Sequence, residues 1–190
     1  DVYVNDAFGT AHRAHASTVG MVKYVATRGV GFLMEKEMRE LGRLLGEVER
    51  PFIAIFGGIK VSDKIGALEN LLPRLDAIVI GGAMANTFLL ATGNSVGRSL
   101  VEDGQLATAR RILERAKGRG IPIILPTDVV AARDLSPGAP ADDGVPASAV
   151  PADRLIVDVG PATIETIRAR VLGAKTIFWN GPLGAEMAVR

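Results

Sequence analysis

The sequence contains no cysteine, which excludes disulfides, thiolate zinc sites and a cysteine nucleophile. It also lacks an excess of charge of one sign, since 22 Lys and Arg residues stand against 21 Asp and Glu residues, a formal net charge of +1. Without a global basic field, charge gives no support to binding of nucleic acid or of a membrane surface. No apolar run approaches the roughly 18 residues of a membrane span. The missing cysteines fit a reducing cytosol, and we expect a cytoplasmic protein.

Apart from these absences, the amino-acid composition is that of a globular protein. The 190 residues are 48% hydrophobic and 23% charged, enough for one sizeable core or for pieces of two domains. The chain opens without a methionine and stops shortly after a glycine-rich turn. We therefore expect an internal piece of a longer protein.

From residue 50 onward, short apolar runs alternate with longer segments of helical periodicity. The runs are apolar at nearly every position, as strands buried on both faces of a parallel sheet require. They are FIAIF (52–56), AIVI (77–80), IPIIL (121–125), LIVDV (155–159) and TIFW (176–179). Helical spacing recurs between them at Ile65, Leu68, Leu72 and Leu75, at Leu106, Ala109, Leu113 and Ala116, and at Ile164, Ile167 and Val171. This alternation predicts a three-layer, Rossmann-like α/β domain with a mainly parallel sheet.

The other segments predict a helix upstream and one long loop downstream. Residues 34–49 have one apolar and one charged helical face, and the glycines of 28–32 precede them as a possible hinge. Gly118 and Gly173 are typical helix ends. Residues 133–154 hold four prolines and no periodicity, which indicates an irregular surface loop with room for a short hairpin.

Glycine-rich turns follow four of the expected strands, at the edge of the sheet where ligands of α/β proteins bind. They are FGGIKVSDK (56–64), IGGAMANTF (80–88), DVGPAT (158–163) and WNGPLG (179–184). For any single turn, tight geometry explains the glycine equally well. Four turns along one edge favour an anion site, since glycine lets backbone N–H groups and helix starts approach a phosphate.

The turn GGIKVSDK is the most informative of the four. It does not match the P-loop pattern, but Lys60 and Lys64 lie four positions apart at a predicted helix start and project toward the same side. Two ammonium groups beside a glycine loop suit a nucleoside triphosphate. The alternative is that Lys64 is a solvated helix residue and that only Lys60 matters. Asp63 would cap the helix or pair with either lysine.

A second candidate anion site lies in NDAFGTAHRAHAS (5–17). This stretch contains both histidines of the chain, His12 and His15, with Arg13 between them. A guanidinium binds carboxylate or phosphate oxygens through two parallel hydrogen bonds. The stretch is either a basic surface loop or an anion site.

Together, these motifs closely resemble the phosphoglycerate kinase family. The resemblance rests on residues 5–17, on GGIKVSDKI, VIGGAMANTFL, VDVGP and WNGPLG, and on their order and spacing over nearly all 190 residues. It implies a carboxyl-accepting phosphotransferase of glycolysis that moves a phosphoryl group between 1,3-bisphosphoglycerate and ADP, giving 3-phosphoglycerate and ATP. It also implies hinge closure between two domains.

The resemblance divides the chain into three parts. Residues 1–32 would be the end of the N-terminal domain, which binds 3-phosphoglycerate, together with the hinge. Residues 33–49 would be the long joining helix, and 50–190 an incomplete nucleotide-binding domain. A monomer in the cytoplasm is expected, with small-molecule substrates and with neither nucleic acid nor membrane as partner.

The resemblance also gives roles to individual residues. Arg13 would bind the phosphoglycerate and, with Lys60, act in catalysis, and His12 would lie beside Arg13, whereas His15 is expected to be structural. Lys60 would steady the transferring phosphoryl group and Lys64 would grip the nucleotide phosphates. The other implied nucleotide-binding residues are Gly58, Ile59, Gly82, Gly160, Asn180, Pro182 and Glu186, with Gly82 and Gly160 beside the adenine.

The sequence departs from the family pattern at two places. After the turn at 179–184 the family carries a ribose-binding Glu one position later than Glu186. Either one residue is missing here and Glu186 fills that role, which is the interpretation we favour, or the contact is lost. The family's Asp ligand of the nucleotide's Mg²⁺ lies outside this chain, and no metal ligand is assigned within it. We interpret Asp128, which follows an expected strand, as structural. The fragment by itself is not expected to turn over efficiently.

Two other functions fit parts of the pattern. A non-catalytic ATP- or ADP-binding module would explain the glycine turns, but it has no use for the separate Arg13 site. A dinucleotide-binding dehydrogenase would need a G-x-G-x-x-G turn, which is absent.

Overall fold

The computed structural model describes residues 1–136 and 138–185, and the chain divides into two compact units. The first unit is Asp1–Val48 and the second is Glu49–Arg190. Among the described residues, the first unit contains one sheet and the second contains two.

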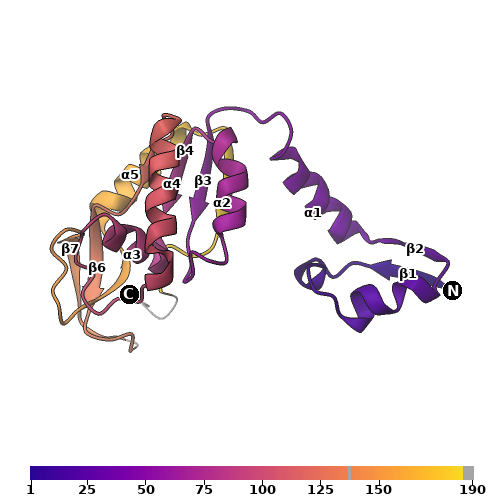
Figure 1. Ribbon diagram of the computed structural model, residues 1–190, viewed down its shortest axis with the longest axis horizontal. Coiled ribbons are helices and arrows are strands. Elements are labelled where there is room, and N and C mark those ends of the chain that lie inside the picture. Colours follow the sequence, from indigo (N-terminus) through magenta and orange to yellow (C-terminus); the bar gives the residue numbers. More distant parts are fainter. Residues whose placement is uncertain (137, 186–190) are drawn as a thin grey trace. The chain divides into compact units, whose positions relative to one another are not determined.

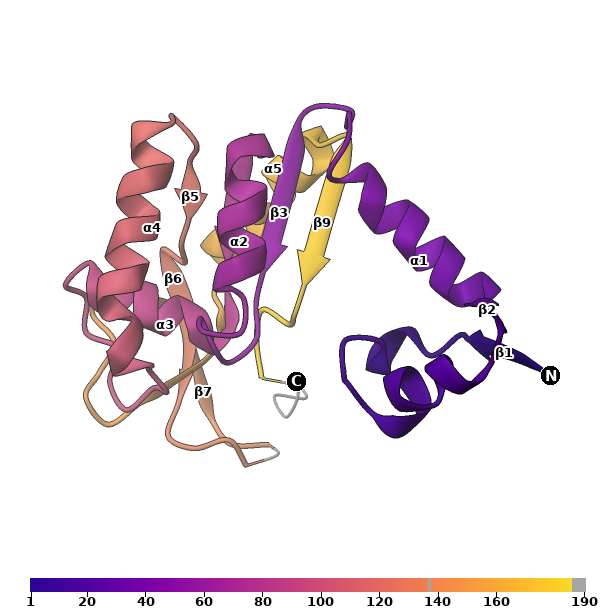
Figure 2. The same cartoon turned by 45° about the vertical axis from the view of Figure 1, so that its right-hand side comes forward.

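The first unit contains a two-stranded parallel sheet and one helix, shown in indigo and purple in Figure 2. Strands β1 (Val2–Asn5) and β2 (Thr27–Val30) are separated by three short helical turns, at Phe8–Thr10, Ala16–Gly20 and Val22–Tyr24. Helix α1 (Phe32–Arg43) follows β2. The N-cap residue before it, Gly31, has no side chain to cap the helix, so the carboxylate of Asp6 accepts the Met34 N–H at 2.9 Å instead.

Helix α1 is shorter than the helix expected over 33–49, because it ends at Arg43. Leu44, Leu45 and Gly46 then donate backbone hydrogen bonds to carbonyls three positions earlier. These shorter-range bonds tighten the chain into a terminal turn that the apolar periodicity of the sequence does not reveal.

The second unit is a three-layer α/β structure around a parallel sheet, as the sequence predicts. The sheet order is β5-β4-β3-β9, formed by β3 (Phe52–Phe56), β4 (Ala77–Ile80), β5 (Ile123–Ile124) and β9 (Thr176–Asn180). Four helices connect the strands: α2 (Ile65–Leu71), α3 (Gly82–Ala91), α4 (Leu106–Gly118) and α5 (Pro161–Gly173). Short 3₁₀ turns at Leu72–Arg74 and Asp103–Gln105 complete the layers.

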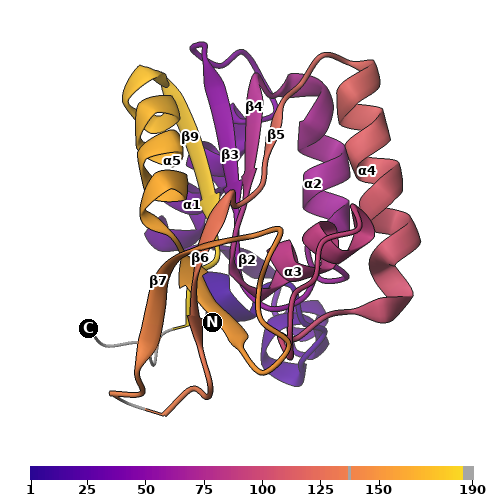
Figure 3. The ribbon, with the colours of Figure 1, turned by 90° about the vertical axis from the view of Figure 1, so that its left-hand side faces the viewer.

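Helices cover both faces of this sheet. Figure 1 and Figure 3 show α2 and α4 on one face and α5 on the other. On the α5 face, Ile53 and Ile55 of β3 pack with Ala77 and Val79 of β4 and with Ile167 of α5. Every residue of β3 and β4 is buried, which explains why these strands lack polar alternation.

A second, antiparallel sheet of order β7-β6-β8 corrects one expectation from the sequence. It contains β6 (Asp128–Ala132), β7 (Ala141–Pro146) and β8 (Leu155–Val159). The apolar run 155–159 predicts a strand of the parallel sheet, but among the described residues β8 pairs with β6 in the antiparallel sheet. A short apolar run specifies a buried strand and not its partner. Strand β7 lies within the segment predicted to be irregular.

Candidate functional site

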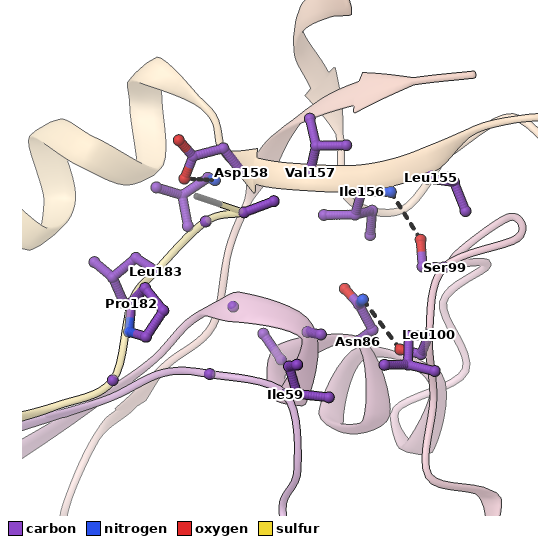
Figure 4. A pocket seen from close by; sticks show the side chains of 18 of the residues that line it. Ile59, Asn86, Ser99, Leu100, Leu155, Ile156, Val157, Asp158, Pro182 and Leu183 are labelled. Atoms are coloured by element: carbon purple, nitrogen blue, oxygen red, sulfur yellow. Dashed lines mark hydrogen bonds between the residues drawn. The ribbon is translucent and has the colours of Figure 1, made fainter. Parts of the chain in front are cut away.

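A pocket of about 780 Å³ lies in the second unit, where β3, β4 and β9 end. Figure 4 shows it between the glycine turns on one side and β8 on the other. Its lining comes from the turn after β3, the start of α3, the segment after α3, strand β8 and the turn after β9. The residues expected to bind nucleotide that line it are Gly58, Ile59, Lys60, Lys64, Gly82 and Pro182.

The three glycine turns of the parallel sheet touch one another at the floor of the pocket. Gly58 N–H donates to Pro182 O at 2.8 Å, and Gly82 N–H donates to Leu183 O at 2.8 Å. A Cβ on Gly82 would lie 2.6 Å from Gly58 N, and the φ of Gly82 is +63°. These two N–H groups are therefore already used within the protein, and the glycines permit close packing of the turns rather than direct contact of those groups with an anion.

The two lysines do converge, as their spacing predicts. Lys60 and Lys64 both line the pocket, Lys60 exposed and Lys64 half-buried. The Lys64 ammonium donates to Oδ1 of Asn180, a residue 116 positions away in the sequence. This contact joins the turn after β3 to the end of β9. The result is a positively charged end of the pocket that suits phosphate oxygens.

The opposite wall of the pocket is apolar. Leu100, Leu155 and Ile156 form much of it, and Figure 4 shows them around Asn86 of α3. Asn86 is buried, and its Nδ2 donates to Leu100 O at 3.2 Å, while its Oδ1 has no hydrogen-bond partner among the described residues. A pocket with a cationic end and an apolar wall accommodates a ligand that has both phosphates and a flat apolar group.

The segment after β9 links the two sheets of this unit. Ala185 N–H donates to Val157 O of β8 at 2.8 Å. Gly184 lies so close to Asp158 that a Cβ would be 2.3 Å from the Asp158 carboxyl carbon. This link fixes one wall of the pocket. Glu186, the expected ribose ligand, lies just beyond it and outside the described residues.

Gly160, expected beside the adenine, is not among the residues that line the pocket. It is buried at the start of α5, where a Cβ would be 2.4 Å from the Asp128 carboxyl carbon. Residues 155–159 of β8 all line the pocket, so the lining ends one residue before Gly160. The pocket wall from this region is formed by β8 itself.

Asp128 caps helix α5, which agrees with its interpretation as structural. Its carboxylate accepts the N–H groups of Ala162 (3.0 Å) and Thr163 (2.7 Å) and the Thr163 hydroxyl (2.6 Å). Burial works to raise the pKa of Asp128, but these hydrogen bonds outweigh burial and hold the pKa below its ordinary value of 3.8.

The pocket includes residues that the sequence patterns did not identify. Asn86, Arg98 and Asp158 line it, and Glu102 holds the turn that carries Lys60. Asn86 and Asp158 lie within two of the glycine-rich motifs, so their place in the sequence could have identified them as candidate pocket residues. Arg98 and Glu102 lie in an irregular segment with no pattern of its own.

The other candidate site is in the first unit, where His12, Arg13 and His15 are all exposed. The Arg13 Nε donates to His12 Nε2 at 3.3 Å, so the His12 ring orients the guanidinium. The His15 backbone is held in a turn with Thr18, whose hydroxyl accepts the His15 N–H at 3.1 Å. Arg13 and His12 thus lie together, as the resemblance implies.

Mg²⁺ is the cofactor that the resemblance implies. Among residues 1–136 and 138–185, no three Asp, Glu, His or Cys side chains gather in a way that could hold a metal ion. The described residues therefore do not fit a resident metal site. The described part of the chain also has no helix long and apolar enough to cross a membrane.

The fold and the pocket define the class of protein: a parallel-sheet α/β protein with a lysine-bearing pocket at the carboxyl ends of its strands. Comparison with known proteins identifies the family. The model of the phosphoglycerate kinase family matches residues 1–188, and the chain belongs to this family.

Similar proteins carry the same name. The chain is 54% identical over 185 residues to a phosphoglycerate kinase of Anaeromyxobacter dehalogenans and 52% identical over 185 residues to one of Chlorobium chlorochromatii, covering 97% of this chain and 46% of each relative. Phosphoglycerate kinase of Coxiella burnetii has a similar structure, with a TM-score of 0.85 and 43% identity over 97% of this chain and 47% of that one. Phosphoglycerate kinase of Pyrococcus horikoshii also has a similar structure, with a TM-score of 0.79 and 30% identity over 97% of this chain and 46% of that one. The chain thus spans about half the length of its relatives.

Proposed function

We propose that this chain is the part of a phosphoglycerate kinase that holds the nucleotide phosphates and part of the phosphoglycerate site. The observation that carries the proposal is that Lys60 and Lys64 line one pocket with an apolar wall and that Asn180, which does not itself line the pocket, accepts a hydrogen bond from the Lys64 ammonium. The reaction is a reversible transfer of a phosphoryl group between ATP and the carboxylate of 3-phosphoglycerate, a step of glycolysis.

In this proposal a carboxylate oxygen of 3-phosphoglycerate forms a bond to the γ-phosphorus of ATP as the bond from that phosphorus to the bridging oxygen of ADP breaks. Such a transfer needs positioning and positive charge on the phosphoryl oxygens rather than a covalent intermediate. Lys64, with Asn180, holds the nucleotide phosphates, Lys60 neutralises charge on the group in transfer, and Arg13 binds the phosphoglycerate with His12 beside it.

The base and ribose of the nucleotide are assigned to the apolar wall. Ile59, Gly82 and Pro182 line the same pocket as the two lysines, which supports their assignment to nucleotide binding. Mg²⁺ enters this scheme as a companion of the nucleotide, since the described residues do not form a resident site. A cytoplasmic monomer remains part of the proposal.

A calorimetric titration of the 190-residue chain with Mg-ADP tests the nucleotide site. Saturable binding is expected, and Lys64→Ala should weaken it by about 10-fold or more because a charge-assisted contact to phosphate is lost. Lys117→Ala, which removes an exposed lysine of α4 outside the pocket, is the matched control. Binding that both variants retain equally would contradict the assignment of Lys64.

The second candidate function is a nucleotide-binding module without chemistry. The exposed Arg13–His12 pair speaks against it, because a nucleotide binder needs no separate anion site. Turnover distinguishes the two: the chain completed to the length of its relatives should convert ATP and 3-phosphoglycerate to ADP and 1,3-bisphosphoglycerate. Nucleotide binding without turnover would favour the module.

A further inference from the structure

The carboxylate of Glu102 binds the turn that carries Lys60. Glu102 follows α3 and immediately precedes the 3₁₀ turn at Asp103–Gln105. Its Oε2 accepts the N–H groups of Val61 at 2.5 Å and Ser62 at 3.1 Å, and its Oε1 accepts the Ser62 hydroxyl at 2.7 Å. These three hydrogen bonds, here called the Glu102 clamp, join segments about 40 residues apart in the sequence.

The clamp satisfies donors that the local chain leaves unpaired. Val61 O accepts the N–H groups of Lys64 and Ile65, which starts the turn into α2. Among the described residues, the N–H groups of Val61 and Ser62 have the Glu102 carboxylate as their acceptor and not a backbone carbonyl. A carboxylate at this place makes charge-assisted hydrogen bonds, which are about twice as strong as neutral ones.

The backbone that the clamp holds carries both pocket lysines. Lys60 immediately precedes Val61, and Lys64 ends the same turn. The backbone N–H of Lys64 donates to the carbonyl of Val61, and its ammonium donates to Oδ1 of Asn180. Val61 is itself buried, with 1% of its surface exposed. Fixing Val61 and Ser62 therefore fixes the direction from which the Lys60 side chain enters the pocket.

Glu102 is held in turn by the core of the unit. Its own N–H donates at 3.1 Å to the hydroxyl of Thr87, a residue of α3 with 1% of its surface exposed. Burial works to raise the pKa of Glu102, but the hydrogen bonds from Ser62 and Val61 and the nearby charge of Lys60 outweigh it and lower the pKa. Glu102 thus stays ionised, and its backbone is held by a buried residue of α3.

We propose that Glu102 is a positioning residue for phosphoryl transfer: it holds the Val61–Ser62 backbone so that Lys60 meets the transferring group. This proposal rests on the proposed function of the pocket. It assigns a role in the reaction to a residue that does not line the pocket and does not belong to any of the glycine-rich turns. If Glu102 acts in folding alone, its substitution should lower the free energy of unfolding and leave kcat unchanged. If it positions Lys60, its substitution should lower kcat in a folded protein.

The test compares Glu102→Gln with Lys60→Ala in the chain completed to the length of its relatives. Gln keeps the size of the side chain but places an amide NH₂ against donors, so at least one hydrogen bond of the clamp is lost. We expect kcat to fall about 10- to 100-fold with less than about a 3-fold change in the KM for ATP, as a misplaced catalytic group predicts. Lys60→Ala should show the same pattern with a larger fall. Asp103→Asn, an exposed neighbour, is the control and should leave kcat unchanged.

Hydrogen exchange in the 190-residue chain checks the structural part of the proposal. Glu102→Gln should speed exchange of the Val61 and Ser62 amides by about 10-fold or more, with little change at the amides of β3 and β4. Unchanged exchange at Val61 and Ser62 would overturn the clamp. Faster exchange with an unchanged kcat would overturn its role in the reaction.

Ser62→Ala keeps the proposal testable if Glu102→Gln does not fold. This substitution removes the hydrogen bond from the Ser62 hydroxyl to Glu102 and leaves the Glu102 carboxylate with its two backbone donors. We expect Ser62→Ala by itself to lower kcat about 3- to 10-fold. An unchanged kcat in Ser62→Ala would overturn the proposal. An inactive parent protein, by contrast, would refute the proposed function, so the two failures are distinguishable.

Discussion

The two lysines of the turn after β3 have different surroundings despite their common spacing. Lys64 is half-buried and bonded to Asn180, whereas Lys60 is exposed at the mouth of the pocket. A lysine already held by a neighbour is preorganised to bind phosphates, and an exposed ammonium, here with the Glu102 carboxylate nearby, is available to follow charge that moves during a reaction. The difference supports a binding role for Lys64 and a catalytic role for Lys60.

Arg13 gives a prediction at the residue scale. Arg13→Ala in the completed chain should raise the KM for 3-phosphoglycerate about 10- to 100-fold, because a guanidinium that binds an oxyanion through two hydrogen bonds is lost. The affinity for ADP should not change. Steady-state kinetics and an ADP titration measure the two quantities. Equal losses in both would make Arg13 a support of the fold rather than a ligand of the substrate.

Asp128 gives a second prediction at this scale, on stability. Asp128→Ala leaves the N–H groups of Ala162 and Thr163 without their acceptor, while the Thr163 hydroxyl keeps the backbone carbonyl of residue 128 at 2.9 Å. We expect the free energy of unfolding to fall by about 2–3 kcal/mol. Urea titration followed by circular dichroism at neutral pH measures this loss. Asp134→Ala, which changes an exposed acid, is the control and should stay within about 0.5 kcal/mol of the parent.

The sign of the pH dependence follows from the lowered pKa of Asp128. A carboxyl whose pKa is lower in the folded state stabilises the protein above its unfolded pKa, near 3.8, and loses that contribution as the pH falls through the folded value. The stability difference between the parent and Asp128→Asn should therefore be constant at about pH 5–7 and shrink below about pH 4. A difference that grows on acidification would contradict this.

At the scale of elements, the glycine turns act as packing surfaces for one another. Gly57 and Gly58 lie against the turn after β9, and Gly82 lies against both. Their N–H groups hold the three strand ends in register, so the pocket is built on a rigid floor. The side chains that line the pocket above this floor, above all the two lysines, are therefore the groups that we propose contact a ligand.

Gly82→Ala should therefore destabilise the second unit strongly. Its φ of +63° and the approach of 2.6 Å between an added Cβ and Gly58 N leave no room without backbone movement, so we expect a loss of about 2–4 kcal/mol. Gly66→Ala in α2 is the matched control, since nothing lies within 4 Å of its added Cβ. That control should be stabilised by up to about 1 kcal/mol. Thermal unfolding of both variants measures the contrast, and similar losses in the two would refute the argument.

At the scale of the whole molecule, the two units differ in the core they contain. In Asp1–Val48, all of which the structure describes, Met34 is the one buried side chain. The second unit buries the whole of β3 and β4 and much of α3. Since buried apolar surface supplies most of the free energy of folding, stability is concentrated in the second unit.

Hydrogen exchange of the 190-residue chain should show this imbalance. Amides of β1, β2 and α1 should exchange at least about 100-fold faster than those of β3 and β4, because local opening of the first unit costs little buried surface. A shortened chain of residues 49–190 should keep the protection of β3 and β4. Equal protection in the two units would mean that the first unit has support beyond its own core.

Much of the fold could be predicted because the signals are local. Phe52–Phe56 and Ala77–Ile80 form strands with the expected bounds, and α5 starts at Pro161 and ends at Gly173, the residues that favour a helix start and a helix end. The convergence of Lys60 and Lys64 also follows from spacing along one turn. In each case the information lies within a few residues of the element concerned.

What the sequence by itself determined is the class of the fold, the family and the set of turns where the site lies. The tertiary structure decided which strand β8 joins, which N–H groups the glycine turns use up, and that Glu102 and Asn180 meet the lysine-bearing turn. These are pairings between segments tens of residues apart. No local periodicity encodes them, because a strand edge or a side-chain oxygen accepts any partner that packing brings within reach.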